Sequence, residues 1–276
     1  MNDTLAAMNG AVALVTGAGN GIGAELAQQL AHGGMKVALV DVDLGAAQKL
    51  ALRLNGVGGQ CLAYQVDVGD PQATSLLAEQ VRRDVGPVRM LINNAGVEML
   101  GRGWEISADK WDRIMRINVN GPVNMVRAFL PGMAAHSQPG YVANVCSIGS
   151  LISIPMQSAY VASKHALLSY TECLLLDVRE AGYSIAVSAV LPGPVRTGIF
   201  DTADGADSPA SDDHRQQMQE MLLHAGMSAD VAARKILEGI FRGDFWISTD
   251  PDLLNSAARQ RADRLSRLAD PAPPGA

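Results

Sequence analysis

The sequence predicts an α/β fold, in which a doubly wound parallel sheet of about seven strands is covered by helices on both faces. Short apolar runs rich in Val, Ile and Leu are typical of strands buried on both faces. Segments with apolar residues at helical spacing alternate with these runs about six times, which favours parallel strands joined by right-handed crossovers. The 276 residues, of which 48% are hydrophobic, are enough for one domain with a sizeable core.

The alternation starts at residue 11 and continues to residue 191. Buried strands are expected at 11–15, 36–40, 60–66, 90–92, 142–145 and 185–191. Helices are expected between them at 22–32, 45–54, 72–85, 108–135 and 157–181. Asp70 followed by Pro71 is a typical helix start, and Gly182 is a typical helix end.

Residues 196–227 break this alternation. They begin with Asp, Gly, Ser and Pro and end in an apolar stretch, which predicts a mobile substrate lid with one amphipathic helix. A helix at 229–242, a short strand at 244–248 and a last helix at 255–268 follow. The closing residues 271–276 are expected to be disordered. We therefore expect one catalytic domain over 1–250, and a C-terminal helix and tail over 251–276.

Composition narrows the classes of function. The formal net charge is −6 and no basic block stands out, which argues against nucleic acid or a membrane as partner. No stretch of 18 apolar residues exists, and residues 1–10 lack the features of a signal peptide. Three widely spaced cysteines fit a reducing cytoplasm, so a cytoplasmic protein is expected. The five histidines show no metal-ligand spacing, and no metal site is expected.

A glycine-rich turn joins the first strand to the first helix, with the sequence Thr16-Gly17-Ala18-Gly19-Asn20-Gly21-Ile22-Gly23. Glycines allow the backbone to turn tightly and to approach a pyrophosphate closely, and the helix that follows points free N–H groups at such an anion. The alternative is a tight turn without a ligand. The position of the glycine-rich turn between a strand and a helix favours a dinucleotide site.

The second strand ends at Asp41, 24 positions after Gly17. This is near the spacing at which an acidic residue binds the adenosine ribose hydroxyls. A carboxylate would repel a 2′-phosphate, and neither Asn20 nor Val42 is an arginine that would attract one. The sequence therefore predicts NAD rather than NADP, unless Asp41 is only a solvated loop residue or a helix cap.

Three further motifs follow in order. The fourth strand ends in Asn93-Asn94-Ala95-Gly96, the fifth in Cys146-Ser147, and Tyr160-Val-Ala-Ser-Lys164 begins 13 residues after Ser147. Together with the glycine turn, these motifs resemble the short-chain dehydrogenase/reductase family over about residues 11–197. The resemblance implies a Rossmann-like fold and hydride transfer with a nicotinamide cofactor.

The resemblance also implies roles for individual residues. Tyr160 would be the acid/base, Ser147 would polarise the substrate oxygen, Lys164 would bind the nicotinamide ribose and lower the tyrosine pKa, and Asn118 would complete a tetrad. Asp67 and Val68 match the adenine contact. The remaining implied cofactor contacts are Gly17, Asn20, Gly21, Ile22, Gly23, Asn94, Ala95, Gly96, Pro192, Gly193, Val195 and Thr197.

The end of the chain departs from the family pattern. No glycine-rich segment follows the strand at 244–248, and a helix with four arginines stands there instead. A homo-oligomer, dimer or tetramer, is still expected, but the usual tetramer contacts are in doubt.

The chemistry explains why these residue types are needed. Tyrosine has an ordinary pKa near 10, and Lys164 lies four residues after Tyr160 on the same helix face, where its charge favours the phenolate. The alternatives are a surface Tyr and Lys on an amphipathic helix and a serine that merely ends a strand. Pro122 cannot donate to the carbonyl of Asn118, so a kink there frees an acceptor for a proton-relay water, or else serves packing alone.

The sequence thus predicts an NAD-dependent oxidoreductase that interconverts a secondary alcohol and a ketone. A set of methionine and other apolar residues could line a pocket for an apolar or ring-bearing substrate, or could equally pack the lid against the domain. These residues are Leu151, Ile152, Ile154, Met156, Ile199, Phe200, Met218 and Met221. The alternatives are an NADPH-dependent carbonyl reductase and a catalytically silent NAD-binding sensor.

Overall fold

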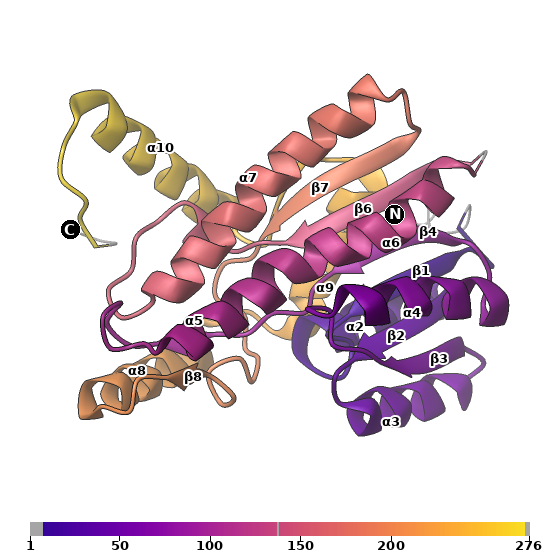
Figure 1. The fold of residues 1–276 in the computed structure, drawn as a ribbon, viewed down its shortest axis with the longest axis horizontal. Coiled ribbons are helices and arrows are strands. Elements are labelled where there is room, and N and C mark those ends of the chain that lie inside the picture. The colour runs from indigo at the N-terminus through magenta and orange to yellow at the C-terminus, as the bar shows by residue number, and fades with distance from the viewer. Residues whose placement is uncertain (1–7, 137, 274–276) are drawn as a thin grey trace.

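A computed structural model describes residues 8–136 and 138–273 of the chain. Seven parallel strands form one sheet in the order β3-β2-β1-β4-β6-β7-β9, as Figure 1 shows. The strands are β1 (Val12–Thr16), β2 (Lys36–Asp41), β3 (Gln60–Gln65), β4 (Val88–Asn93), β6 (Gly140–Val145), β7 (Ile185–Leu191) and β9 (Trp246–Ser248). The expected doubly wound parallel sheet is confirmed, and its order reverses between β1 and β4.

Helices cover both faces of this sheet. One hydrophobic cluster joins it to α2 (Gly21–His32), α3 (Leu44–Asn55) and α9 (Ala229–Arg242). A second cluster, on the opposite face, joins it to α4 (Pro71–Asp84), α6 (Gly121–Ala134) and α7 (Ser158–Glu180). Because apolar side chains are buried above and below the sheet, central strands such as β1 and β2 are almost continuous apolar runs.

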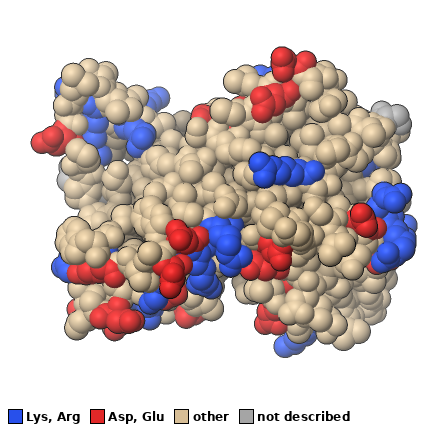
Figure 2. Space-filling view, in the orientation of Figure 1, with Lys and Arg blue, Asp and Glu red and all other residues tan. Residues whose placement is uncertain are grey.

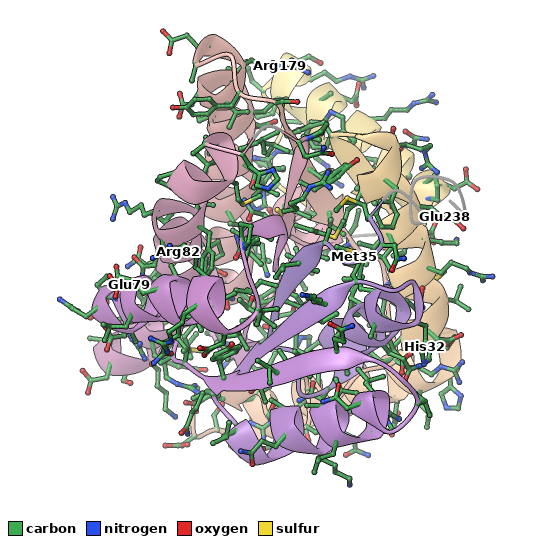
Figure 3. The ribbon with its side chains drawn as sticks, turned by 90° about the vertical axis from the view of Figure 1, so that its right-hand side faces the viewer. His32, Met35, Glu79, Arg82, Arg179 and Glu238 are labelled. Carbon is green, nitrogen blue, oxygen red and sulfur yellow. The ribbon has the colours of Figure 1, made fainter. Side chains whose placement is uncertain are left out.

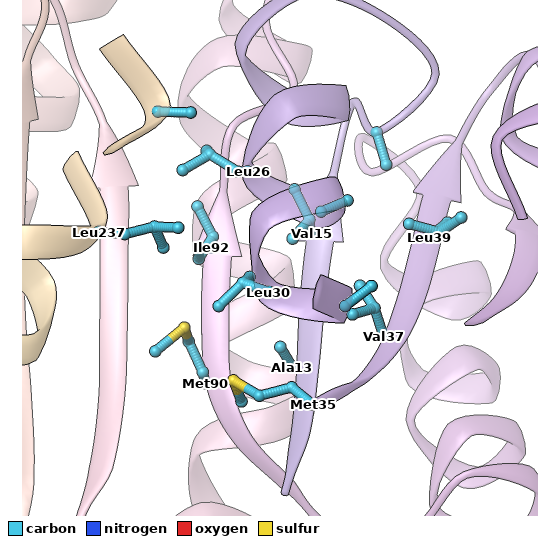
Figure 4. Packing of buried hydrophobic residues seen from close by; sticks show 14 of the residues in the cluster. Ala13, Val15, Leu26, Leu30, Met35, Val37, Leu39, Met90, Ile92 and Leu237 are labelled. Atoms are coloured by element: carbon cyan, nitrogen blue, oxygen red, sulfur yellow. The ribbon is translucent and has the colours of Figure 1, made fainter. Parts of the chain in front are cut away.

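The core between α2 and the sheet is closely packed. Leu26 and Leu30 of α2 lie against Val15 of β1 and Ile92 of β4, and Leu237 of α9 closes the cluster (Figure 4). Polar residues take the outer faces of the helices, as Glu79 and Arg82 of α4 do in Figure 3. The alternation of buried and exposed positions therefore fixes each helix on the sheet.

The helix expected at 108–135 is interrupted. It consists of α5 (Ala108–Met115), a π-helical turn at Arg116–Asn120, and α6. The Gly121 N–H bonds the carbonyl of Arg116, five residues back. Pro122, in the first turn of α6, has no N–H to continue an ordinary ladder, and a π-turn is one way to absorb that loss. The expected helical segment is thus present, and its hydrogen-bond ladder changes directly before Pro122, where the sequence predicts an irregularity.

The helix signals at Asp70 and Gly182 are confirmed. The Asp70 carboxylate accepts the N–H groups of Gln72 and Ala73 at the start of α4. Gly182 follows α7 with φ at +70°, a left-handed conformation that favours glycine.

Residues 196–227 carry two elements. Strand β8 (Asp204–Gly205) pairs in parallel with β5 (Met99–Leu100), and helix α8 (Pro209–Ala225) follows. Phe200 and Leu222 are buried against Leu100, so part of the segment is packed on β5. Its expected mobility as a lid stays a prediction.

The C-terminal helix α10 (Pro251–Arg267) begins four residues earlier than expected and projects from the body (Figure 1). The expected disordered tail at 271–276 lies partly outside the described residues, which end at 273. Within 8–136 and 138–273, no helix is long and apolar enough to cross a membrane. Figure 2 shows acidic and basic side chains interspersed on one face of the molecule.

Candidate active site

The glycine turn lies at the carboxyl edge of β1, beside the point where the strand order reverses. Gly17 and Gly21 have φ values of +62° and +54°. A Cβ on Gly23 would overlap the carbonyl oxygen of Gly17, so only glycine lets α2 pack this closely. The Asn20 side chain does not cap α2, which leaves the N–H groups of its first turn open to an external anion.

Asp41, the last residue of β2, reaches the same turn. One carboxylate oxygen accepts the Gly19 N–H at 2.7 Å, and the other accepts the Asp43 N–H at 2.9 Å. Asp43, not Asp41, caps α3, through the N–H of Ala46. The helix-cap alternative for Asp41 is therefore wrong, and its carboxylate borders the glycine turn.

The loop after β4 closes the other side of the turn. Asn94 Nδ2 donates to the carbonyls of Thr16 and Gly17, at 3.0 and 3.2 Å. The backbone N–H groups of Asn94 and Ala95 both donate to Thr16 Oγ1 at 3.0 Å. This network holds two adjacent strand ends in register and forms a fixed wall beside the open helix end.

Asp67 and Val68 lie beyond the end of β3, and each has a partner. Asp67 accepts hydrogen bonds from Arg116 and from the Gly69 N–H, at 2.7 and 2.8 Å. Burial alone would raise the pKa of Asp67, but these two hydrogen bonds hold it below its ordinary value. The Val68 carbonyl accepts from Asn124 at 3.0 Å. Sequence reasoning missed Arg116, since nothing local links it to a residue 49 positions away.

Tyr160 and Lys164 lie one turn apart on α7 and are both buried. The Lys164 ammonium donates to the Val145 carbonyl at 2.8 Å and lies 5.7 Å from the centre of the Tyr160 ring. The alternative of a surface Tyr and Lys on an amphipathic helix is therefore wrong. Both side chains are at the carboxyl end of β6, next to the loop after β4.

Ser147 follows β6 and borders Tyr160. Its Oγ accepts the Gly149 N–H at 3.0 Å. A Cβ on Gly149 would lie 3.3 Å from Ser147 Oγ and 3.5 Å from Tyr160 Cε1, so both side chains border the same glycine. A short helical turn at Ile148–Ser150 thus brings the two hydroxyl-bearing residues together.

Asn118 sits in the π-turn and is fully buried. Its side chain accepts the Val97 N–H at 2.8 Å and donates to the Val97 carbonyl at 2.9 Å and to Ser163 at 3.0 Å. The alternative of a solvated asparagine is therefore wrong. Asn118 links the loop after β4 to α7, and thereby fixes Tyr160 and Lys164 relative to that loop.

Burial controls the proton affinities of this group. It raises the pKa of Tyr160, the Glu98 carboxylate raises it further, and the hydrogen bond with Ser147 lowers it. Burial lowers the pKa of Lys164, opposed by Cys146 and Glu98. In the protein alone, the pKa of Tyr160 therefore moves opposite to the direction expected from Lys164, because burial and the Glu98 carboxylate both raise it.

Residues after β7 connect the loop of Ser147 to the glycine turn. The Pro192 carbonyl accepts from the Ile148 N–H at 3.0 Å, and the Gly193 N–H donates to Thr249 Oγ1 at 3.0 Å. Val195 is buried, and Thr197 packs against Gly21, where an added Cβ would lie 3.2 Å from its methyl group. The predicted cofactor residues of the glycine turn, the β4 loop and this segment thus line one edge of the sheet.

Sequence reasoning also missed Glu98. Only 2% of this residue is exposed, and it lies near enough to Tyr160 and Lys164 to influence both pKa values. Burial raises the pKa of Glu98 itself to about 8. The position of Glu98, four residues after Asn94 at the end of the same loop, was the sequence signal that could have placed it near the site.

The short chain dehydrogenase family model matches residues 11–207. The chain belongs to the short-chain dehydrogenase/reductase family. A family member from Burkholderia phymatum, solved in complex with NAD, superposes with a TM-score of 0.92 at 32% identity and covers 98% of this chain and 99% of its own. The fold is thus that of a family member over nearly the whole chain.

Two relatives in the family match most of their own length. Putative oxidoreductase SadH of Mycobacterium tuberculosis is 33% identical over 240 residues, 87% of this chain and 86% of its own. A dehydrogenase/reductase of CLA biosynthesis from Lactiplantibacillus plantarum is 29% identical over 273 residues, with 95% and 94% covered. Probable oxidoreductase EphD of M. tuberculosis is 31% identical over 230 residues, and there the match spans only 38% of its length.

Proposed function

We propose that this oxidoreductase interconverts a secondary alcohol and a ketone with NAD(H). The observation that carries the proposal is the placement of Ser147, Tyr160 and Lys164 around the carboxyl end of β6, on the same sheet edge as the open glycine turn. Ligands of doubly wound sheets bind at that edge.

The residues at this edge fit NAD. The free N–H groups at the start of α2 suit a pyrophosphate, and the Asp41 carboxylate suits the two hydroxyls of an adenosine ribose. Val42, next to Asp41, is 67% exposed and apolar, so it offers no positive charge to a 2′-phosphate. Asp41 therefore supports NAD over NADP.

When bound, oxidised NAD would supply the acceptor for the hydride that leaves the substrate carbon. Tyr160 takes the proton from the substrate hydroxyl, and Ser147 holds the substrate oxygen by a hydrogen bond. Since burial raises the pKa of Tyr160 in the protein alone, the phenolate requires added positive charge, of which Lys164 is the protein's part. Lys164 is held in place by the Val145 carbonyl.

The proton taken by Tyr160 must then reach solvent. We propose a route through Lys164 to a water held by the backbone carbonyl of Asn118. Pro122 supports this route, because it has no N–H with which to occupy that carbonyl in an ordinary helix.

An apolar or ring-bearing substrate is supported by the surroundings of Tyr160. Met99, Ile106 and Ile199 belong to the hydrophobic cluster that includes it. Phe200, Met218 and Met221 pack with Leu100 in the adjoining cluster, which supports residues 196–227 as the substrate lid. We further propose one catalytic domain at 1–250, with 251–276 as an appended helix and tail, and assembly as a homo-oligomer.

A panel of secondary alcohols, followed by NADH absorbance, tests the proposal. Tyr160→Phe should lower turnover by about 10²–10⁴-fold and leave NAD binding nearly intact, because the lost hydroxyl serves proton transfer. Tyr183→Phe, at a half-exposed tyrosine, is the matched control. Lys164→Met should harm turnover and NAD affinity together. If Tyr160→Phe retains more than about a tenth of the activity, the assignment of Tyr160 is wrong.

A further inference from the structure

Glu98 is a buried carboxyl inside the catalytic group that the proposed mechanism does not use. It is 2% exposed, and Tyr160 and Lys164 both lie within its electrostatic reach. Its neighbours in the sequence, Val97 and Met99, belong to the hydrophobic cluster around Tyr160. Burying a carboxyl in such surroundings is costly unless its oxygens are hydrogen-bonded.

The backbone around Glu98 is fixed on both sides. The preceding residue, Val97, exchanges two hydrogen bonds with the Asn118 side chain. The Glu98 carbonyl accepts the Asp204 N–H of β8 at 3.3 Å, which ties it to the segment over the site. The position of the carboxyl is therefore determined by the same contacts that assemble the catalytic group.

One carboxylate oxygen is satisfied and the other is not. Glu98 Oε1 accepts the Met99 N–H at 2.9 Å. Among residues 8–136 and 138–273, Oε2 receives no hydrogen bond, and no Lys, Arg or His lies within 4.0 Å to form an ion pair. A fixed, buried acceptor without a protein partner, beside the acid/base, is suited to a donor on the substrate.

We propose that Glu98 determines substrate specificity by accepting a hydrogen bond from a hydroxyl or amino group on the carbon next to the reacting one. The substrate class is then a vicinal diol or amino alcohol with an apolar remainder, and in the reductive direction the corresponding α-hydroxy or α-amino ketone. This inference rests on the proposed alcohol–ketone activity. A site built for such a donor discriminates against analogues that lack it, because the acceptor is then left unpaired.

The test compares matched substrates. Each pair is an apolar secondary alcohol with and without a hydroxyl, or an amino group, on the neighbouring carbon. The pairs are assayed with NAD above pH 8, because the pKa of Glu98 is about 8 and the ionised carboxylate is the acceptor. The wild-type protein should favour the substituted member in kcat/KM by at least about tenfold. Glu98→Leu should remove that preference, because kcat/KM should fall at least about tenfold more for the substituted member than for the plain alcohol, mainly through a higher KM.

Two further variants separate specificity from folding. Glu98→Gln keeps an acceptor for the Met99 N–H and should retain part of the preference for the diol. Glu105→Gln, in the loop after β5 and paired with Arg102 near the surface, is the control and should match the wild type. Thermal unfolding of each variant shows which are folded. If Glu98→Leu is not folded, the substrate preference of Glu98→Gln alone decides the role of Glu98.

Each outcome is informative. Equal kcat/KM for both members of every pair, or equal losses on both members in Glu98→Leu or Glu98→Gln, overturns the role of Glu98 while the alcohol–ketone activity stands. A preference confined to the hydroxyl or to the amino member identifies which donor is recognised. No turnover of any pair by a wild-type protein that binds NAD overturns the proposed function, and the Glu98 proposal with it.

Discussion

Replacing Gly23 by alanine should disable the glycine turn without touching a catalytic side chain. The added Cβ would overlap the Gly17 carbonyl oxygen and lie 2.5 Å from Asn94 Nδ2. The first contact is with backbone, so the turn itself must shift. Overpacking of this kind costs about 1–3 kcal/mol. If the overlap destabilises the NAD-bound conformation by this free energy, NAD affinity drops by roughly ten- to hundredfold.

Gly132→Ala is the matched control. Gly132 lies in α6, is exposed, and has no atom within 4 Å of an added Cβ. In a helix interior this change stabilises by about 1 kcal/mol. NAD titration by protein fluorescence, together with urea unfolding of both variants, compares the two. If Gly23→Ala binds NAD as tightly as Gly132→Ala, the close approach of the turn to the cofactor is refuted.

Four further predictions address other parts of the site. Asp41→Ala with Val42→Arg should shift preference toward NADP in paired kcat/KM measurements, and a wild type that already prefers NADP contradicts the role of Asp41. Pro122→Ala should lower turnover by about tenfold with unchanged NAD affinity and a larger solvent isotope effect, whereas parental turnover reduces the π-turn to packing. Hydrogen exchange at 196–227 should slow when NAD and a substrate analogue bind together, and unchanged exchange counts against a lid. Because the pKa of Glu98 is raised from 4.5 to about 8, its stabilising contribution is full below about pH 4.5 and is lost as pH rises to about 8. In Glu98→Gln the free energy of unfolding should therefore fall less steeply over that pH range than in the wild type, by up to about 1.4 kcal/mol per pH unit. Urea unfolding of the cofactor-free proteins measures this, and parallel pH profiles of the two proteins would contradict the raised pKa of Glu98.

The sheet could be predicted because its strands are buried on both faces. Val37 and Leu39 face one hydrophobic cluster while Ala38 and Val40 face the other, so β2 is a continuous apolar run. The glycine turn, Asp41 and Ser147 could be placed for a related reason. Each follows directly on a strand, and the carboxyl ends of parallel strands meet at one edge.

The remaining contacts depend on pairings between distant segments. Glu98 enters the site because β5 pairs with β8 more than a hundred residues later, and two-residue strands leave no periodic pattern. Arg116, in the π-turn, pairs with Asp67 at a separation of 49 residues, and no local pattern indicates that contact. The pKa of Tyr160 depends on burial by several elements, and the sequence spacing between Tyr160 and Lys164 gives no information on that burial.

The central claim is that Tyr160 supplies the proton while NADH supplies the hydride. The most direct measurement uses NADH with deuterium at both hydrogen positions of the nicotinamide C4. Mass spectrometry then follows the label into the carbinol carbon formed from a ketone. We predict one deuterium per product molecule with the wild-type protein, none on carbon from deuterated water, and at least about a hundredfold slower labelling with Tyr160→Phe. Deuterium taken from water onto the carbinol carbon, or labelling by Tyr160→Phe at the wild-type rate, would contradict this account.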